Sequence, residues 1–163
     1  MESYLKKICT LEEAKINCDA LKNSGKRRIV FTNGCFDILH PGHARYLSSA
    51  RDLGDYLIVA LNSDRSVRSI KGTKRPIFPE KMRAELLAAL ECVDSVLIFD
   101  EENPLRVIKS LLPHILVKGG DWQKNQIIGA DVVKATGGQV RRIPFVTGYS
   151  TTSIIDKIVR QYT

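Results

Sequence analysis

Short apolar runs recur along the chain at regular distances. They are rich in β-branched and aromatic residues and are bounded by Gly, Pro, Asn or Asp, which is typical of buried β-strands. Five strands are expected, in the segments RRIVFTN (27–33), DYLIVALN (55–62), DSVLIF (94–99), HILVKGG (114–120) and GQVRRIPF (138–145).

Amphipathic segments with helical spacing fill the intervals between these runs. Helices are expected at about 41–52, at 79–91, from 103, at 129–136 and from 151. Within 79–91, Met82, Leu86 and Leu90 mark the expected buried stripe. Near the start, Thr10 and Glu13 form a capping box and predict one more helix, which ends near Gly25.

Strands that alternate with helices in this way predict a parallel sheet with helices on both faces. The expected fold class is therefore α/β, a Rossmann-like three-layer sandwich with a parallel sheet of about five strands. In such sheets ligands bind beyond the carboxyl ends of the strands, where the direction of the connections reverses. The loops expected there are 33–43, 62–75, 118–125 and 144–152.

The stretch TNGCFDILHPGH (32–43) places two of the three histidines around Pro41 and Gly42, at a strand-to-helix turn. With His40 as the N-cap and Pro41 in the first helical position, the amides of Gly42 and His43 should be free to bind an anion. Both imidazoles can then donate hydrogen bonds to one phosphate. The alternative is that one ring caps the helix and the other packs in the core.

Length, composition and charge narrow the picture. With 163 residues and 44% apolar content, the chain fits one domain, 1–163, with its N-terminal helix in 1–25. A formal net charge of +7 favours anionic partners. The four cysteines show no zinc-ligand spacing, so no metal site is expected. No signal peptide or membrane-spanning run is found in the sequence, and we expect a cytoplasmic protein with reduced thiols.

Two motifs carry a family resemblance. GCFDILHPGH resembles the signature of the HxGH nucleotidyltransferase superfamily, in which that motif binds a triphosphate and stabilises the transition state. TGYSTTSII, about a hundred residues later, resembles the Ser-Thr-Thr segment that opens the last helix in that superfamily. Taken with LNSDRSV, KGTKRPI, ALECVD and LVKGGDW, the chain from about residue 28 is most similar to the adenylyltransferase family of bacterial ADP-heptose synthesis.

This resemblance implies transfer of AMP from ATP to D-glycero-β-D-manno-heptose 1-phosphate, with Mg²⁺ as the cofactor. Members of the family often fuse this domain to a sugar kinase, and we expect a stand-alone enzyme with no kinase domain. The expected partner is a small-molecule sugar phosphate, with neither nucleic acid nor a membrane. Relatives are often homodimers, but the oligomeric state is left open.

Catalysis is assigned to His40, His43 and Lys71, of which Lys71 matches a phosphate-binding lysine of related cytidylyltransferases. A flexible lysine can follow a phosphate through an in-line displacement. Residues at the motifs and after the strand LVKGG are assigned to the nucleotide: Asn33, Gly34, Cys35, Phe36, His40, Gly42, His43, Lys118, Gly119, Asp121, Ser150, Thr151 and Thr152.

The sugar phosphate is assigned to Asp37, Lys71, Arg83 and Trp122. Asp37 could order a sugar hydroxyl or a metal-bound water, and Arg83 matches a family arginine near the phosphates, although a surface ion pair with a neighbouring Glu explains it almost as well. Trp122 could stack on a sugar or base or fill a core edge. His114 is expected to be an ordinary surface residue.

Three other functions remain open. A cytidylyltransferase acting on glycerol 3-phosphate is the nearest, although Phe145 and Val146 stand where such relatives have polar residues. A basic RNA-binding module and a nucleotide sensor without turnover are the others. No basic residue follows the Ser-Thr-Thr segment directly, and Lys157, one helical turn later, could substitute.

Overall fold

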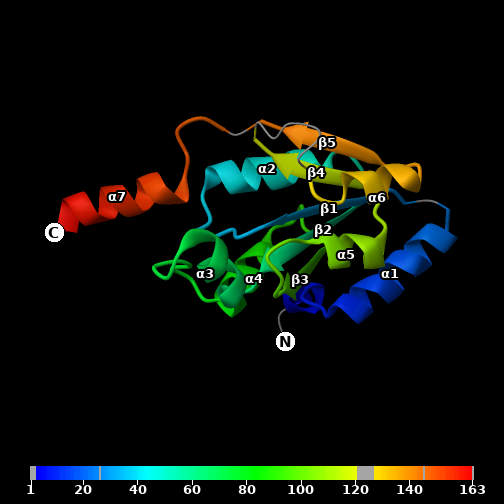
Figure 1. The fold of residues 1–163 in the computed structure, drawn as a ribbon, viewed down its shortest axis with the longest axis horizontal. Helices are drawn as coiled ribbons and strands as arrows, with labels where there is room; N and C mark the ends of the chain where they lie inside the picture. Colours follow the sequence, from blue (N-terminus) through cyan, green and yellow to red (C-terminus); the bar gives the residue numbers. More distant parts are fainter. Residues whose placement is uncertain (1–2, 26, 121–126, 145, 163) are drawn as a thin grey trace.

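The computed structural model describes residues 3–25, 27–120, 127–144 and 146–162. A five-stranded parallel sheet, in the order β3-β2-β1-β4-β5, runs through the centre (Figure 1). Its strands are β1 (Ile29–Gly34), β2 (Tyr56–Asn62), β3 (Ser95–Phe99), β4 (Ile115–Gly119) and β5 (Gln139–Ile143). The predicted fold class and all five predicted strands are confirmed.

Helices cover both faces of this sheet, as predicted. They are α1 (Leu11–Asn23), α2 (Pro41–Arg51), α3 (Asp64–Lys71), α4 (Glu80–Ala89), α5 (Leu105–Leu111), α6 (Ala130–Ala135) and α7 (Thr151–Tyr162), after the short 3₁₀ helix η1 (Ser3–Lys7). The predicted capping box at Thr10 and Glu13 starts α1. Among the described residues, no helix combines the length and apolarity needed to span a bilayer.

The alternation of side chains along each strand creates two separate cores. On one face, Phe31 of β1 and Leu116 of β4 pack with residues of α1, α5 and α6. On the other face, Val30 of β1 and Val117 of β4 pack with residues of α2 and α4. These strands are buried on both sides, which explains why they appear in the sequence as continuous apolar runs.

The chain reverses its direction across the sheet at β1. From β1 it moves outward through β2 to β3 and then crosses back to β4 on the other side of β1. The carboxyl ends of β1 and β4 therefore flank the crevice in which ligands bind in sheets of this kind. The HxGH motif, residues 40–43, lies in the connection from β1 to α2 and the first turn of that helix. Lys118 and Gly119 are the last two residues of β4.

Two local expectations are wrong. Residues 62–75 are not one loop, because α3 begins after Ser63, whose hydroxyl accepts the Ser66 amide. In α4, Met82 and Leu86 are exposed, while Leu87 and the charged Arg83 are buried. Apolar spacing alone misplaced this buried stripe by one residue, because an arginine occupies an inward position.

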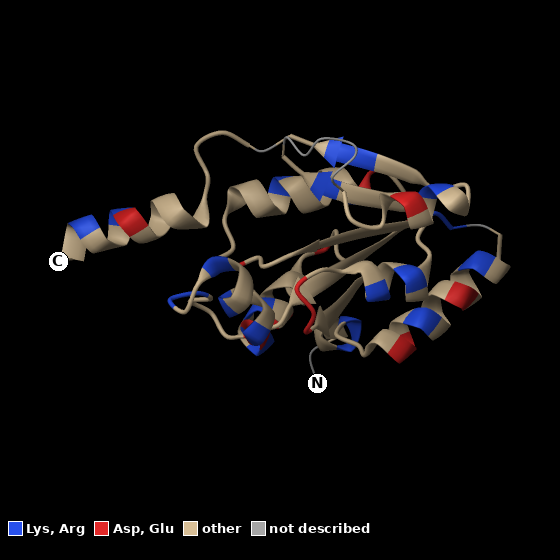
Figure 2. Ribbon diagram, viewed as in Figure 1, with Lys and Arg blue, Asp and Glu red and all other residues tan. Residues whose placement is uncertain are grey.

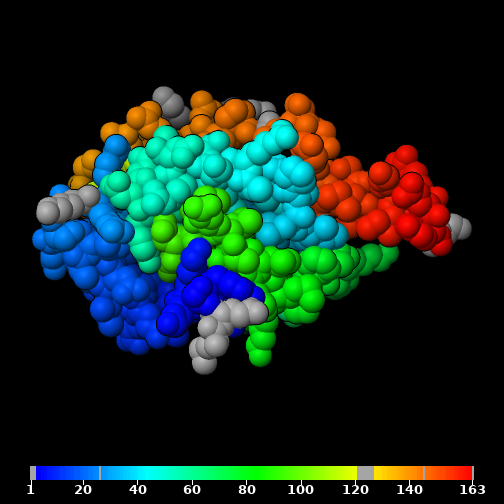
Figure 3. All heavy atoms as spheres, turned by 180° about the vertical axis from the view of Figure 1, so that it is seen from behind, coloured from blue at the N-terminus to red at the C-terminus, as the bar shows by residue number. Residues whose placement is uncertain are grey.

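Helix α7 projects from one end of the molecule, at the red end of the colour scale in Figures 1 and 3. None of its residues is buried. The Ser-Thr-Thr segment begins at Ser150, directly before α7, and continues into its first turn, where the Thr151 hydroxyl bonds to the main chain of Asp37.

Candidate active site

The two sequence motifs meet in space, although more than a hundred residues separate them. The Thr151 hydroxyl, at the start of α7, donates a 2.7 Å hydrogen bond to the main-chain oxygen of Asp37. The Tyr149 ring stacks on the His40 ring, with 6.2 Å between centroids. The guanidinium of Arg45, in α2, lies over the ring of the same Tyr149, 5.6 Å from its centroid. The start of α7 therefore lies beside the start of α2.

Helix α2 begins as predicted, with His40 as the N-cap in extended conformation and Pro41 in the first turn. One expectation about this turn is wrong, because the amide of His43 donates to the oxygen of His40 at 2.9 Å. Gly42 also has a packing role: a Cβ there would lie 3.0 Å from the His40 ring and 3.1 Å from Cβ of Tyr149. Glycine thus allows the two motifs to approach each other closely.

The imidazoles of His40 and His43 are stacked, with centroids 3.7 Å apart and planes inclined by 19°. The edge of Phe36 supports His43 from 5.4 Å. In both rings Nδ1 is buried and has no hydrogen-bond partner among the described residues. An unpartnered buried nitrogen is costly, so this pair is a place where a ligand would supply the missing partner.

Burial keeps both rings neutral. Burial first, and then the neighbouring His40, lower the pKa of His43 to about 4, against a smaller opposing effect of Asp37. Burial also lowers the pKa of His40. A bound polyphosphate would oppose both effects, because negative charge favours the protonated imidazole.

The carboxylate of Asp37, which was expected to order a sugar hydroxyl or a metal-bound water, is buried and hydrogen-bonded within the protein. Its carboxylate is 1% exposed and accepts hydrogen bonds from Nε of Arg75 at 2.7 Å and from the amides of Ile77 and Phe78 at 2.8 and 2.9 Å. Burial would raise the pKa of Asp37, but the amides of Phe78 and Ile77 and then Arg75 outweigh it, and the pKa lies below its usual value. Asp37 therefore fixes the loop before α4 against the HxGH turn.

Arg83, which was assigned to the sugar phosphate, is likewise buried, at 0% exposed. Its guanidinium donates to four oxygens, which belong to Phe78, Cys35, Asn62 and Asp64. The ion pair joins it to Asp64 at 2.7 Å and not to a neighbouring glutamate. Arg83 thus links the carboxyl ends of β1 and β2 to α4.

The carboxyl ends of β1 and β4 are joined by a side-chain contact. Nζ of Lys118 donates to Oδ1 of Asn33 at 2.5 Å. Burial lowers the pKa of Lys118 to about 8. Both residues were assigned to the nucleotide, and the structure brings them together beside the HxGH turn.

Four other assigned residues have separate surroundings. Cys35 follows β1, and burial raises the pKa of its thiol against the nearby Lys71 and arginines, in keeping with a non-nucleophilic role. Lys71 is exposed at the end of α3. Ser150 caps α7 by accepting the amide of Ser153 at 3.0 Å. The hydroxyl hydrogen of Thr151 is donated to Asp37, so its amide, and not its hydroxyl, remains as a donor for a phosphate.

Gly34, Gly119 and Thr152 lie at the same edge, at the ends of β1 and β4 and in the first turn of α7. A Cβ on Gly34 would lie 3.0 Å from the Phe36 ring, so a larger residue there would make the ring shift. Asp121 and Trp122 lie outside the described residues.

The described part of the chain provides no set of side chains that would bind Mg²⁺ by themselves. No group of three or more His, Cys, Asp or Glu side chains there could hold a metal ion. Asp37, the carboxylate nearest the histidines, already accepts three donors.

Sequence reasoning missed Arg75, Tyr149 and His114. Tyr149 precedes the Ser-Thr-Thr motif and could have been noted as its aromatic neighbour, but nothing in the sequence pairs Arg75 with Asp37. His114 is not an ordinary surface residue, because its Nδ1 accepts the amide of Ile29 at 3.0 Å and so completes the start of β1.

Comparison with known proteins gives consistent results. The profile of the family described as cytidylyltransferase-like matches residues 31–157. The bifunctional protein HldE of Geobacter metallireducens is 56% identical over 144 residues, which cover 88% of this chain and 29% of that protein. HldE of Pelobacter propionicus is 51% identical over 156 residues, 96% of this chain and 32% of that protein. The chain thus spans about a third of the length of these relatives.

Solved structures show the same fold. A lipopolysaccharide core biosynthesis protein from Thermoplasma volcanium superposes with a TM-score of 0.61 at 28% identity, covering 76% of this chain and 99% of that one. Pantoate-beta-alanine ligase from Francisella tularensis gives a TM-score of 0.60 at 15% identity, covering 94% of this chain and 77% of that one, and shows likeness of fold alone.

The buried histidines should make the protein less stable in acid. The folded state holds the pKa of His43 at about 4, below the ordinary 6.5, so the unfolded chain binds a proton first as the pH falls. The free energy of unfolding should therefore decrease between pH 6.5 and about 4 and lose no more from this group below that. Urea unfolding at several pH values measures it, and His43→Gln should flatten this part of the curve. An unchanged slope in the variant would contradict the assignment.

Replacement of Arg83 should destabilise the fold strongly. Arg83→Met leaves three main-chain oxygens and the Asp64 carboxylate without their donor, and removal of one partner from a buried charged network costs about 3–5 kcal/mol. The urea midpoint measures the effect. Arg65→Met, which removes an exposed ion pair with Asp100, serves as the control and should leave the midpoint nearly unchanged. Equal midpoints for the two variants would show that Arg83 is not the internal brace described here.

Proposed function

The chain belongs to the cytidylyltransferase-like family, and on this premise we propose that it transfers AMP from ATP to D-glycero-β-D-manno-heptose 1-phosphate, releasing pyrophosphate. One observation carries the proposal more than any other: the HxGH turn and the Ser-Thr-Thr segment lie against each other through Thr151 and Asp37. Two helix starts, those of α2 and α7, thus lie side by side, as a polyphosphate site requires.

The choice of acceptor and nucleotide rests on the relatives. Proteins named HldE match at 51% to 56% identity across most of this chain, and a structural relative is titled as a lipopolysaccharide core biosynthesis protein. The motifs LVKGGDW and KGTKRPI add the resemblance to the adenylyltransferases of ADP-heptose synthesis. ATP is accordingly proposed as the donor and the sugar 1-phosphate as the acceptor.

In the proposed reaction an oxygen of the sugar phosphate attacks the α-phosphorus of ATP. The new P–O bond forms as the bond from the α-phosphorus to the bridging oxygen breaks, and pyrophosphate leaves with that electron pair. The nucleophile is already an anion at neutral pH, so no general base is required. Catalysis then consists of positioning and charge stabilisation.

The histidine pair would act on the triphosphate. The rings are neutral before binding, and their buried nitrogens have no partner among the described residues. Phosphate oxygens would accept hydrogen bonds from them and raise their pKa, so that the donors strengthen as charge develops on the leaving pyrophosphate. Lys71 lies exposed at the end of α3, close enough to Cys35 for its charge to lower the pKa of that thiol. It would add a mobile positive charge to the site.

A cytidylyltransferase is the second candidate, because the matching family is described by that activity. Phe145, one of the residues that argued against cytidine in the sequence, lies outside the described residues.

The reaction is tested by measuring pyrophosphate release with ATP, CTP and GTP against heptose 1-phosphate, glycerol 3-phosphate and FMN. We expect release with ATP and heptose 1-phosphate only. Release with CTP and glycerol 3-phosphate would replace the proposal with the cytidylyltransferase. Nucleotide binding without release for any pair would indicate a sensor, and an RNA mobility shift that survives excess ATP would indicate an RNA-binding module.

Removal of the histidine donors should abolish most turnover. His43→Ala or His40→Ala should lower kcat by about 100- to 1,000-fold, because each removes a donor to charge in the transition state. Lys71→Ala should also lower kcat, and Lys74→Ala, three residues away and equally exposed, is its matched control. Wild-type turnover in His43→Ala would refute the role given to the pair.

A further inference from the structure

The side chain of His40 lacks the hydrogen bonds that usually fix an imidazole. His40 is the N-cap of α2, but its ring makes no capping bond. Its buried Nδ1, like that of His43, has no partner among the described residues. A ring without such a bond is free to turn about its side-chain torsions unless its faces are packed. The groups that pack against those faces therefore determine where the ring nitrogens point.

Flat groups from both sequence motifs make these contacts. Phe36 lies edge-on to His43, with 5.4 Å between ring centroids, and His43 stacks on His40 at 3.7 Å. Tyr149, directly before the Ser-Thr-Thr segment, stacks on His40 with centroids 6.2 Å apart and planes inclined by 16°. Aromatic rings attract one another in offset stacks at about 4.5–7 Å. Tyr149 is thus the contribution of the second motif to the position of the histidines.

Tyr149 fits closely against the start of α2. A Cβ on Gly42 would lie 3.1 Å from Cβ of Tyr149, so the absence of a side chain there lets the tyrosine approach. Helix α2 carries two arginines, Arg45 and Arg51, whereas the first turn of α7 carries no charged residue (Figure 2). The guanidinium of Arg45 lies over the Tyr149 ring, and a cation in that position is attracted to the aromatic face. Arg45 thus helps to keep Tyr149 beside His40.

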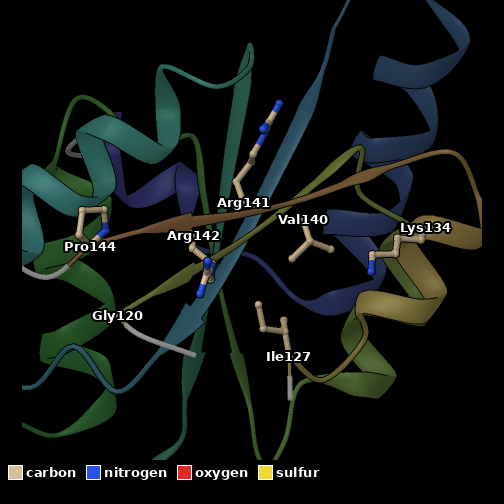
Figure 4. A pocket seen from close by; sticks show the side chains of 7 residues that line it. All are labelled: Gly120, Ile127, Lys134, Val140, Arg141, Arg142 and Pro144. Carbon is tan, nitrogen blue, oxygen red and sulfur yellow. The ribbon is translucent and has the colours of Figure 1, made fainter. Parts of the chain in front are cut away.

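The aromatic stack lies apart from the apolar cores and from the cavity of about 500 Å³ beside β5 and α6 (Figure 4). Neither Tyr149 nor the histidines are among the described residues that line that cavity. Tyr149 is 40% exposed and belongs to neither core. Its ring can therefore be replaced without opening a hole in the protein interior, so that a change in turnover reports on the stack itself.

We propose that Tyr149 is a positioning residue, which fixes the plane of the His40 imidazole by stacking on it and so aims that ring at the triphosphate. The inference rests on the proposed function. A donor in the transition state must point to the place where charge develops, and a displacement of about 1 Å can lower a rate about 100-fold. Because Tyr149 directly precedes Ser150, it also links the start of α7 to the histidine that acts on the leaving pyrophosphate.

Kinetics of Tyr149 variants test this role. Tyr149→Leu retains apolar bulk but removes the flat face, so kcat should fall by about 10- to 100-fold. The Kd for the non-hydrolysable ATP analogue AMPCPP, measured by calorimetry, should change by less than about threefold, because Tyr149 acts on the transition state through His40. Tyr149→Phe retains the stacking face and should keep kcat within about twofold of the wild type. Tyr162→Leu is the matched control, because it removes an 82% exposed ring at the far end of α7.

A double-mutant cycle separates positioning from any other contribution of Tyr149. In a His40→Ala background, Tyr149→Leu should change kcat by less than about twofold, because the ring that it positions is absent. A second measurement does not depend on activity. The ¹H–¹³C NMR signals of the His40 ring should differ between the wild type and Tyr149→Leu, because the ring current of the tyrosine is lost.

Each other outcome counts against the inference. An active wild type with unaltered kcat in Tyr149→Leu overturns the inference alone, and so do His40 signals that do not move. An equal fall in kcat with and without His40 would show that Tyr149 does not act through that ring. A loss of AMPCPP affinity as large as the fall in kcat would assign Tyr149 to nucleotide binding. If the wild-type protein binds AMPCPP but transfers AMP to no sugar phosphate, the proposed function fails and this inference fails with it.

Discussion

A buried carboxylate, Asp37, is the contact on which the rest of the site depends. Its side chain accepts hydrogen bonds from Arg75 and from two amides of the loop before α4, and its main-chain oxygen accepts the hydroxyl of Thr151. Two segments distant in sequence, the loop before α4 and the start of α7, are therefore held at Asp37. A buried carboxylate is tolerated only when it is satisfied in this way, so loss of these donors would be costly. The stacked histidines lie three and six residues after Asp37, so the contacts of Asp37 also position them.

Arg83 similarly connects the end of β1 to the neighbouring strand β2. It is an internal cation whose donors reach the ends of β1 and β2 and the start of α3. The two charged residues, Asp37 and Arg83, hold the loops, whereas the buried nitrogens of His40 and His43 have no hydrogen-bond partner in the described part of the chain. Satisfied polar groups form the scaffold here, and unsatisfied ones mark where a ligand would bind.

The strands and most helices could be predicted, because parallel strands buried on both faces leave a continuous apolar signal and the start of α2 has a clear His-Pro-Gly-His pattern. The meeting of the two motifs followed from the sheet's topology. The roles of Asp37 and Arg83 could not be predicted, because a sequence shows that a residue is charged but not whether it points inward. For the same reason α4 was oriented on Met82 and Leu86, both exposed, and His114 was taken for a surface residue although it accepts the amide of Ile29. Lys118 and Asn33, assigned only from their position at strand ends, do lie together.

The central claim is that the starts of α2 and α7 form one polyphosphate site. Titration of the ¹⁵N-labelled protein with AMPCPP tests it directly by NMR. The amide signals of Gly42 and His43 and those of Thr151 and Thr152 should shift along a single binding curve with one Kd. Shifts confined to one helix start, or two curves with different Kd values, would contradict the account.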